Sequence, residues 1–189
     1  PRRFVVAGTS GVAIPAAADF TTDTVSDLRN TGNQADLIVI AHPTALDVTA
    51  TTTLNALLAW KLANQGITSK VAMIQDVFDE FGDGLQTPQA IKNFLAFTLS
   101  TNPGEGWSGR KPAWVLLIGD GSYDSKYIDT SVPASNFVPT QILFKDDPAF
   151  GYYASDSILA SVAGGDAIPD LVVGRVPTRS DVQTATVIQ

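Results

Sequence analysis

Two side chains that could carry out chemistry stand just after hydrophobic runs. His42 is the only histidine of the chain and directly follows the apolar run 37–41, and Ser122 comes four residues after the apolar run 114–118. A serine nucleophile needs a histidine base and an orienting carboxylate, so a small serine hydrolase built on Ser122 and His42 is one hypothesis. No G-x-S-x-G elbow follows a predicted strand, which favours a hydrogen-bonded, non-catalytic role for His42.

The carboxylates offer a second kind of chemistry. All but two of the 19 acidic residues are aspartates, which favour turns and hard cations. Asp166 and Asp170 flank a turn that contains glycine, where their oxygens and backbone carbonyls could surround Ca²⁺, and Asp156 could add another oxygen. Asp120, after the run 114–118, could bind a cation or hold its loop in place. The alternative for the turn is an ordinary Asx turn.

Composition excludes several other functions. Without cysteine the chain cannot hold a disulfide, a thiolate metal site or a cysteine nucleophile, and one histidine rules out a two-histidine metal site. The net charge of −7 argues against nucleic-acid binding. No apolar run approaches the roughly 18–20 residues of a membrane span. The G-x-G-x-x-G motif at 104–109 follows a predicted helix and precedes a strand, so we interpret it as a loop and not as a nucleotide site.

Strands and helices that alternate along the chain must position these residues. Short apolar runs predict strands, and leucine spacing or a Thr-Pro start predicts helices. The strands are expected at 37–41, 71–74, 114–118 and 170–174, and the helices over Leu54–Leu62 and from Thr87 to Leu95. This order predicts a three-layer α/β domain with a mainly parallel sheet, whose functional surface lies beyond the carboxyl ends of the strands.

The remaining segments complete the predicted organisation. We expect residues 1–33 to form an N-terminal strand and loop lead-in, and residues 34–189 to form the α/β unit. Residues 119–168 are expected to be mostly loop, with a hairpin between 140–144 and 152–159. Thr178 and Asp181 fit a capping box that starts a helix, for which no stop signal follows. We therefore expect the chain to be a fragment of a longer protein.

Five segments carry a family resemblance. They are Ser26–Arg29 with Gln34–Pro43, Gln75–Gly82, Thr87–Leu95, Trp114–Asp124 and Ile168–Pro177. In this order they resemble the gingipain-like cysteine peptidase domain of peptidase family C25. The resemblance implies a caspase-like, Rossmann-like half domain from a secreted or surface-associated bacterial protein. In that family the His–Cys dyad and the substrate pocket belong to a second subdomain, downstream of the last matching segment.

The resemblance therefore assigns no catalytic residue to this chain. His42 does not match the family's catalytic histidine, and we expect the chain alone to be inactive. Its implied role is to support the downstream catalytic subdomain, and through that subdomain a protein or peptide substrate, in an extracellular or cell-surface location. The alternative is a catalytically inactive, peptidase-like scaffold that acts as a binding or adhesion module.

A structural calcium site is also implied by the resemblance. Asp120, Asp166 and Asp170 occupy places that match the family's Gly-Asp and its Asp/Gly-rich stretch. This chain has Gly164, Gly165 and Ala167 where members often have further Asp or Gly. The expected metal ligands are therefore Asp120, Asp166 and Asp170.

Overall fold

The computed structural model describes residues 26–189 except 126, 132–134 and 146–150. The predicted strand and loop within residues 1–25 lie outside the described residues. The helices are α1 (Val48–Gln65), α2 (Ile74–Gly82), α3 (Pro88–Leu99), the 3₁₀ helix η3 (Ser157–Ala160) and α4 (Asp181–Val187). The strands are β1 (Leu37–Ala41), β2 (Ser69–Met73), β3 (Trp114–Ile118), β4 (Gln141–Lys145), β5 (Gly151–Ser155) and β6 (Val172–Val176).

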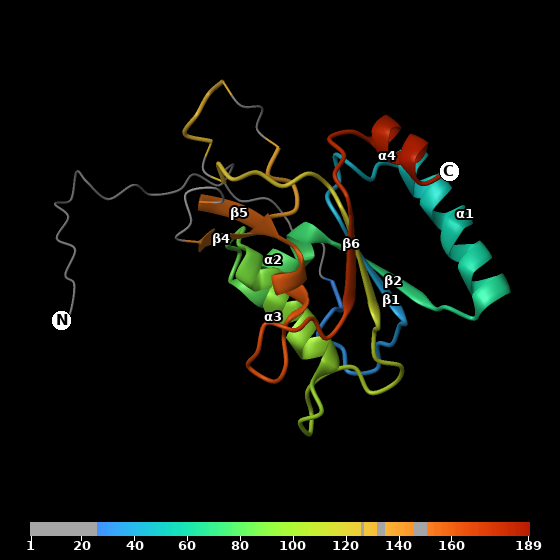
Figure 1. Cartoon of the computed structure of the whole chain (residues 1–189). Helices are drawn as coiled ribbons and strands as arrows, with labels where there is room; N and C mark the ends of the chain where they lie inside the picture. Colours follow the sequence, from blue (N-terminus) through green and yellow to red (C-terminus); the bar gives the residue numbers. More distant parts are fainter. Residues whose placement is uncertain (1–25, 126, 132–134, 146–150) are drawn as a thin grey trace, which may run out of the picture.

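Four strands form a parallel sheet in the order β2-β1-β3-β6. All five residues of β1 are buried, because helices cover both faces of the sheet. Ile38 and Ile40 pack in the core with α2 and α3, whereas Leu37 and Val39 pack with α1 and α4 on the opposite face (Figure 1). The predicted three-layer α/β architecture is confirmed.

Two strand boundaries and one helix differ from expectation. The second and fourth strands run over 69–73 and 172–176, two residues away from the predicted starts at 71 and 170. Ile74 begins helix α2, which was not predicted from the sequence. Its apolar residues recur at helical spacing and are buried: Ile74, Val77, Phe78 and Phe81.

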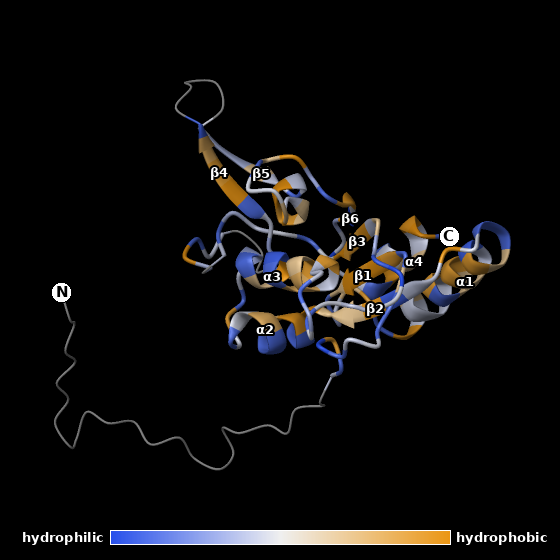
Figure 2. Cartoon of the chain, turned by 90° about the horizontal axis from the view of Figure 1, so that it is seen from below, coloured by the Kyte–Doolittle hydropathy of each residue, from blue (hydrophilic) through white to orange (hydrophobic). Residues whose placement is uncertain are grey.

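The predicted hairpin is present as the antiparallel pair β4–β5, in which Phe144 lies opposite Tyr152. It stands apart from the four-stranded sheet (Figure 2). Residues 157–159, predicted to belong to its second strand, form η3 together with Ala160 instead.

The predicted capping box at Thr178 and Asp181 is wrong. Ser180 caps α4 by accepting a hydrogen bond from the backbone N–H of Gln183. The Asp181 carboxylate instead accepts hydrogen bonds from the backbone N–H groups at the start of α1, those of Asp47, Thr49 and Ala50, at 2.8–3.0 Å. It therefore stabilises the N-terminus of a different helix.

None of the helices in the described part of the chain is both long enough and apolar enough to span a bilayer.

Candidate functional site

The segment after β3 folds back over the carboxyl end of the sheet. The carbonyl of Asp120 accepts hydrogen bonds from the backbone N–H groups of Phe137 and Val138, at 2.9 and 3.0 Å. The Phe137 ring then stacks on the His42 ring, with centroids 4.3 Å apart and planes 10° apart. His42 follows β1, so these contacts join the carboxyl ends of the two central strands.

Arg175 on β6 stabilises this arrangement through its hydrogen bonds. Its guanidinium binds both carboxylate oxygens of Asp156 at 2.7 Å. Its Nη1 also donates to the carbonyls of Gly119 and Val138, each at 2.8 Å. A planar guanidinium suits four such bonds, whereas a lysine ammonium cannot match their geometry. One side chain thus fixes the end of β3, the returning segment and the residue before η3.

His42 is not arranged as a base for Ser122. Its Nδ1 accepts a hydrogen bond from the Thr44 backbone N–H, which places the proton of the neutral ring on Nε2. Partial burial lowers the pKa of His42 and favours this neutral form. Ser122 Oγ accepts from the Asp124 backbone N–H, and no hydrogen bond joins Ser122 to His42, both of which are described. The geometry does not support the serine-hydrolase hypothesis.

Two adjoining cavities open at this end of the sheet. The first, of about 330 Å³, lies beside His42 and Phe137 and reaches Gln75 in the first turn of α2. The second, of about 210 Å³, lies between the start of α3 and the segment after β3, including Ser122. The two cavities share Gln86 and Asn136. None of the described residues that line the two cavities has a charged side chain, and their polar groups are amides, hydroxyls and the neutral ring of His42.

The three predicted metal ligands are each engaged by the protein. Asp120 accepts hydrogen bonds from the Gly121 backbone N–H at 3.0 Å and from Arg179 at 2.7 Å. Asp166 accepts one from the Ile168 backbone N–H, which forms an Asx turn. Asp170 accepts hydrogen bonds from two backbone N–H groups, those of Ala163 and Val162, which lower its pKa.

The fold places these aspartates at different ends of the sheet. Asp120 follows β3, whereas Asp170 precedes β6, and the two strands are parallel. Across residues 26–189, apart from the three undescribed gaps, no three His, Cys, Asp or Glu residues gather to hold a metal ion. The carboxylate of Asp156 is bound to Arg175. Asp120, Asp166 and Asp170 therefore do not fit one shared ion, and calcium binding stays a prediction for measurement in solution.

The G-x-G-x-x-G segment lies in turns between α3 and β3, as expected for a loop. Gly106 has φ of +73°, and a Cβ there would lie 2.3 Å from the Ser100 carbonyl oxygen. The next residue, Trp107, is fully buried and donates from its indole nitrogen to the Leu28 carbonyl at 3.0 Å. The glycine thus serves the packing of Trp107 against the core.

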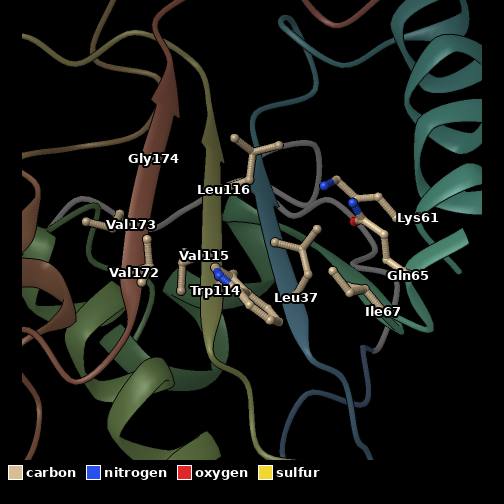
Figure 3. A pocket seen from close by; sticks show the side chains of 10 residues that line it. All are labelled: Leu37, Lys61, Gln65, Ile67, Trp114, Val115, Leu116, Val172, Val173 and Gly174. Carbon is tan, nitrogen blue, oxygen red and sulfur yellow. The ribbon is translucent and has the colours of Figure 1, made fainter.

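A larger apolar groove lies on the sheet face that carries α1 (Figure 3). It measures about 520 Å³ and runs over β1, β3 and β6, beside Lys61 and Gln65 of α1. Trp114 and Val172 in its wall are 41 % and 65 % exposed. This groove was not predicted, although the apolar residues that β3 and β6 place on both faces of the sheet indicate an apolar surface on the α1 side. β6 also forms the sheet edge, with β3 as its one neighbour among the described strands.

Comparisons with known proteins agree with this fold. The family model of peptidase family C25 matches residues 30–189. The crystal structure of dimeric latent PorU from Porphyromonas gingivalis is similar, with a TM-score of 0.60 and 19 % sequence identity. The match covers 82 % of this chain but 15 % of the PorU chain, and a comparison with curated proteins gave no match. The resemblance seen in the sequence is confirmed: the chain belongs to peptidase family C25.

Proposed function

We propose that this chain is the non-catalytic first subdomain of a secreted gingipain-like cysteine endopeptidase, which supports a following subdomain bearing a His–Cys dyad. Three observations support the proposal. The chain belongs to a cysteine peptidase family and contains no cysteine. It covers a small part of the PorU chain. It also exposes an apolar groove beside an open strand edge. Extracellular or cell-surface placement is part of the same proposal.

The apolar groove is the observation that carries this proposal. Monomeric soluble domains rarely leave a contiguous apolar surface open unless a partner covers it. A covering segment would remove exposed surface of Trp114, Leu116 and Val172 from water. Each Å² of apolar area that is buried in this way stabilises the assembly by about 25 cal/mol. The chain leaves β6 into α4 on this face, since Ala185 packs with Leu37 and Val39. A following segment would start on the side that needs covering.

In such a parent enzyme the chemistry belongs to the second subdomain. A cysteine thiolate attacks the peptide carbonyl, and histidine protonates the leaving amine. This half contributes the packing surface that holds the second subdomain in place. Peptide hydrolysis is therefore not expected from the 189-residue chain alone. Hydrolysis that disappears on changing His42 or Ser122 would contradict this division of roles.

The direct test extends the chain through the following segment of its parent protein and treats it with a thiol-reactive peptide probe. We expect labelling of one cysteine, and loss of labelling when the paired histidine is changed. A well-folded longer protein without labelling would overturn the peptidase role and favour the inactive binding or adhesion module instead.

A matched pair of variants tests the supporting surface itself. Val172→Glu places a charge in the groove, whereas Leu62→Glu places one on an exposed part of α1 that does not line it. In the longer protein we expect Val172→Glu to lower the melting temperature and the labelling rate, because a charge would be buried there. Leu62→Glu should leave both unchanged. Equal behaviour of the two variants would refute the proposed packing surface.

A further inference from the structure

The two cavities at the carboxyl end of the sheet form one elongated site, which we call the carboxyl-end trough. They meet at Gln86 and Asn136, and together they extend from His42 to Ile142 at the start of β4. The trough lies beyond the carboxyl ends of β1, β2 and β3, where ligands bind in open parallel sheets. It is separate from the apolar groove, because no residue lines both.

The walls of the trough are held in place by the protein itself. Arg175 donates hydrogen bonds to the carbonyls of Gly119 and Val138, and the stacked rings of His42 and Phe137 line one part of the trough. Asn136 Oδ1 accepts a hydrogen bond from the Ser122 backbone N–H at 3.1 Å. A site whose walls are already ordered loses little entropy when a ligand binds.

The polar atoms of the trough are neutral and include donors still available to a ligand. Asn136 is 8 % exposed, and its Nδ2 forms no hydrogen bond with another described residue. His42 keeps its Nε2 proton because Nδ1 is occupied by Thr44. The amide of Gln86 offers two N–H donors and a carbonyl acceptor. Ile74 and Phe78 add apolar wall beside these groups.

We propose that the carboxyl-end trough binds an extended, uncharged segment of a polypeptide substrate. Peptide N–H and C=O groups pair with the amides of Gln86 and Asn136 and with His42, and an apolar side chain packs against Ile74, Phe78 and Phe137. The polar groups on the described residues of the lining are all neutral, so an acidic or basic segment would lose hydration there without gaining a charged partner among them. The substrate class rests on the proposed function: the non-catalytic half would also hold part of the substrate.

The experiment is an NMR titration of the 189-residue chain with capped hexapeptides that carry one Phe in an Ala and Ser background. We expect shifts at the side-chain signals of His42, Gln86 and Asn136. Peptides with Phe replaced by Asp or Lys should bind at least about 10-fold more weakly, from the loss of apolar contact and the desolvation of the charge. A shift pattern confined to other residues, or the absence of binding at millimolar peptide, would overturn the proposal.

Conservative variants make the test specific. Asn136→Asp keeps Oδ1 for Ser122 but replaces the Nδ2 donor, and Gln86→Glu places a charge on the shared wall. Each should weaken binding about 5- to 10-fold, as expected for the loss of one or two hydrogen bonds. Gln89→Glu, on the exposed side of α3 and outside both cavities, should change nothing. Equal losses of peptide affinity in Gln86→Glu and Gln89→Glu would refute the proposal. A neutral hexasaccharide serves as a second probe, and the proposal would also be refuted if it, and not the peptides, shifted the signals of the trough.

Failure of this inference is distinguishable from failure of the proposed function. Peptide binding without thiol labelling of the longer protein would retain the trough and reject the peptidase role. Labelling without peptide binding would reject the trough alone. In an active longer protein, Gln86→Glu should raise KM for the Phe hexapeptide sequence without changing kcat, relative to Gln89→Glu. An unchanged KM of Gln86→Glu in the longer protein would also reject peptide binding by the trough, even if the 189-residue chain cannot be titrated.

Discussion

Replacing Arg175 with methionine removes the hydrogen bonds that hold in place the end of β3 and the returning segment that lines the carboxyl-end trough. Methionine keeps much of the side-chain volume but none of the four hydrogen bonds that Arg175 donates to Asp156, Gly119 and Val138. Breaking a buried ion pair by removing one partner costs about 3–5 kcal/mol, because the other charge is left without compensation. The side chains of Arg175 and Asp156 remain 12 % and 24 % exposed, so water offsets part of this loss. We expect a decrease of about 3 kcal/mol in the free energy of unfolding.

The assay is urea unfolding followed by circular dichroism and by the fluorescence of the tryptophans, of which Trp107 is fully buried. For a domain of this size about 3 kcal/mol corresponds to a melting temperature lower by roughly 6–12 °C. Arg175→Met combined with Asp156→Leu should be less destabilised than Arg175→Met alone, because no carboxylate remains buried without its partner.

The ion pair between Arg175 and Asp156 also predicts how the stability of the fold depends on pH. Burial alone raises the pKa of Asp156, but the hydrogen bonds and charge of Arg175 together lower it below its usual value. A lowered carboxyl pKa stabilises the folded state above the unfolded pKa, and this contribution is lost as the pH falls through the folded pKa. The difference between the parent chain and Arg175→Met should therefore be full at neutral pH and shrink below about pH 4. A difference below about 0.5 kcal/mol at neutral pH, or a double variant less stable than the single one, would refute this reasoning.

Three further predictions concern stability. Gly106→Ala should cost about 3 kcal/mol, since its Cβ would meet the Ser100 carbonyl, whereas Gly104→Ala, with open space around it, should cost about 1 kcal/mol in chemical unfolding. Equal costs would contradict the steric argument. Asp181→Ala should lower the melting temperature at neutral pH, and the difference should narrow in acid, because hydrogen bonds from Ala50 and its neighbours outweigh burial and lower the pKa of Asp181. A pH-independent difference would argue against the cap. Asp170→Ala should lower the melting temperature, because its carboxylate accepts two backbone hydrogen bonds. If calcium is also bound at Asp170, EDTA should lower the melting temperature of the parent chain but not that of Asp170→Ala, and an unchanged melt of the parent chain in EDTA would contradict the calcium prediction.

Local patterns in the sequence were enough to predict the central layers of the fold. The continuous apolar run of β1 is typical of a strand buried on both faces, and Gly66, which adopts φ of +67° after α1, is typical of the end of a helix. The spacing of Ile74, Val77, Phe78 and Phe81 could also have predicted α2, but Ile74 was assigned to the preceding strand.

The candidate sites depended on contacts between distant residues, which local patterns do not specify. Asp181 had the right spacing for a capping box, yet its carboxylate binds the start of α1. The pairing of Asp156 with Arg175 and of Asp120 with Arg179 depends on how the loops return to the sheet. The metal prediction also conflicts with the predicted parallel sheet. A residue that follows one parallel strand and a residue that precedes its neighbour must lie at opposite ends of the sheet.

The contact between Asp181 and the start of α1 has a consequence for the order of folding. Asp47 and Asp181 are 134 positions apart, so α1 lacks this cap until nearly the whole chain is available. The strands are parallel, and each pair also joins distant segments, which makes closure of these contacts slow compared with local helix formation. During synthesis from the N-terminus, β1, β2 and β3 emerge before the strand and helix that complete their α1 face. We therefore expect this face to assemble late. During refolding, the backbone amides at the N-terminus of α1 should be the last to become protected from hydrogen exchange.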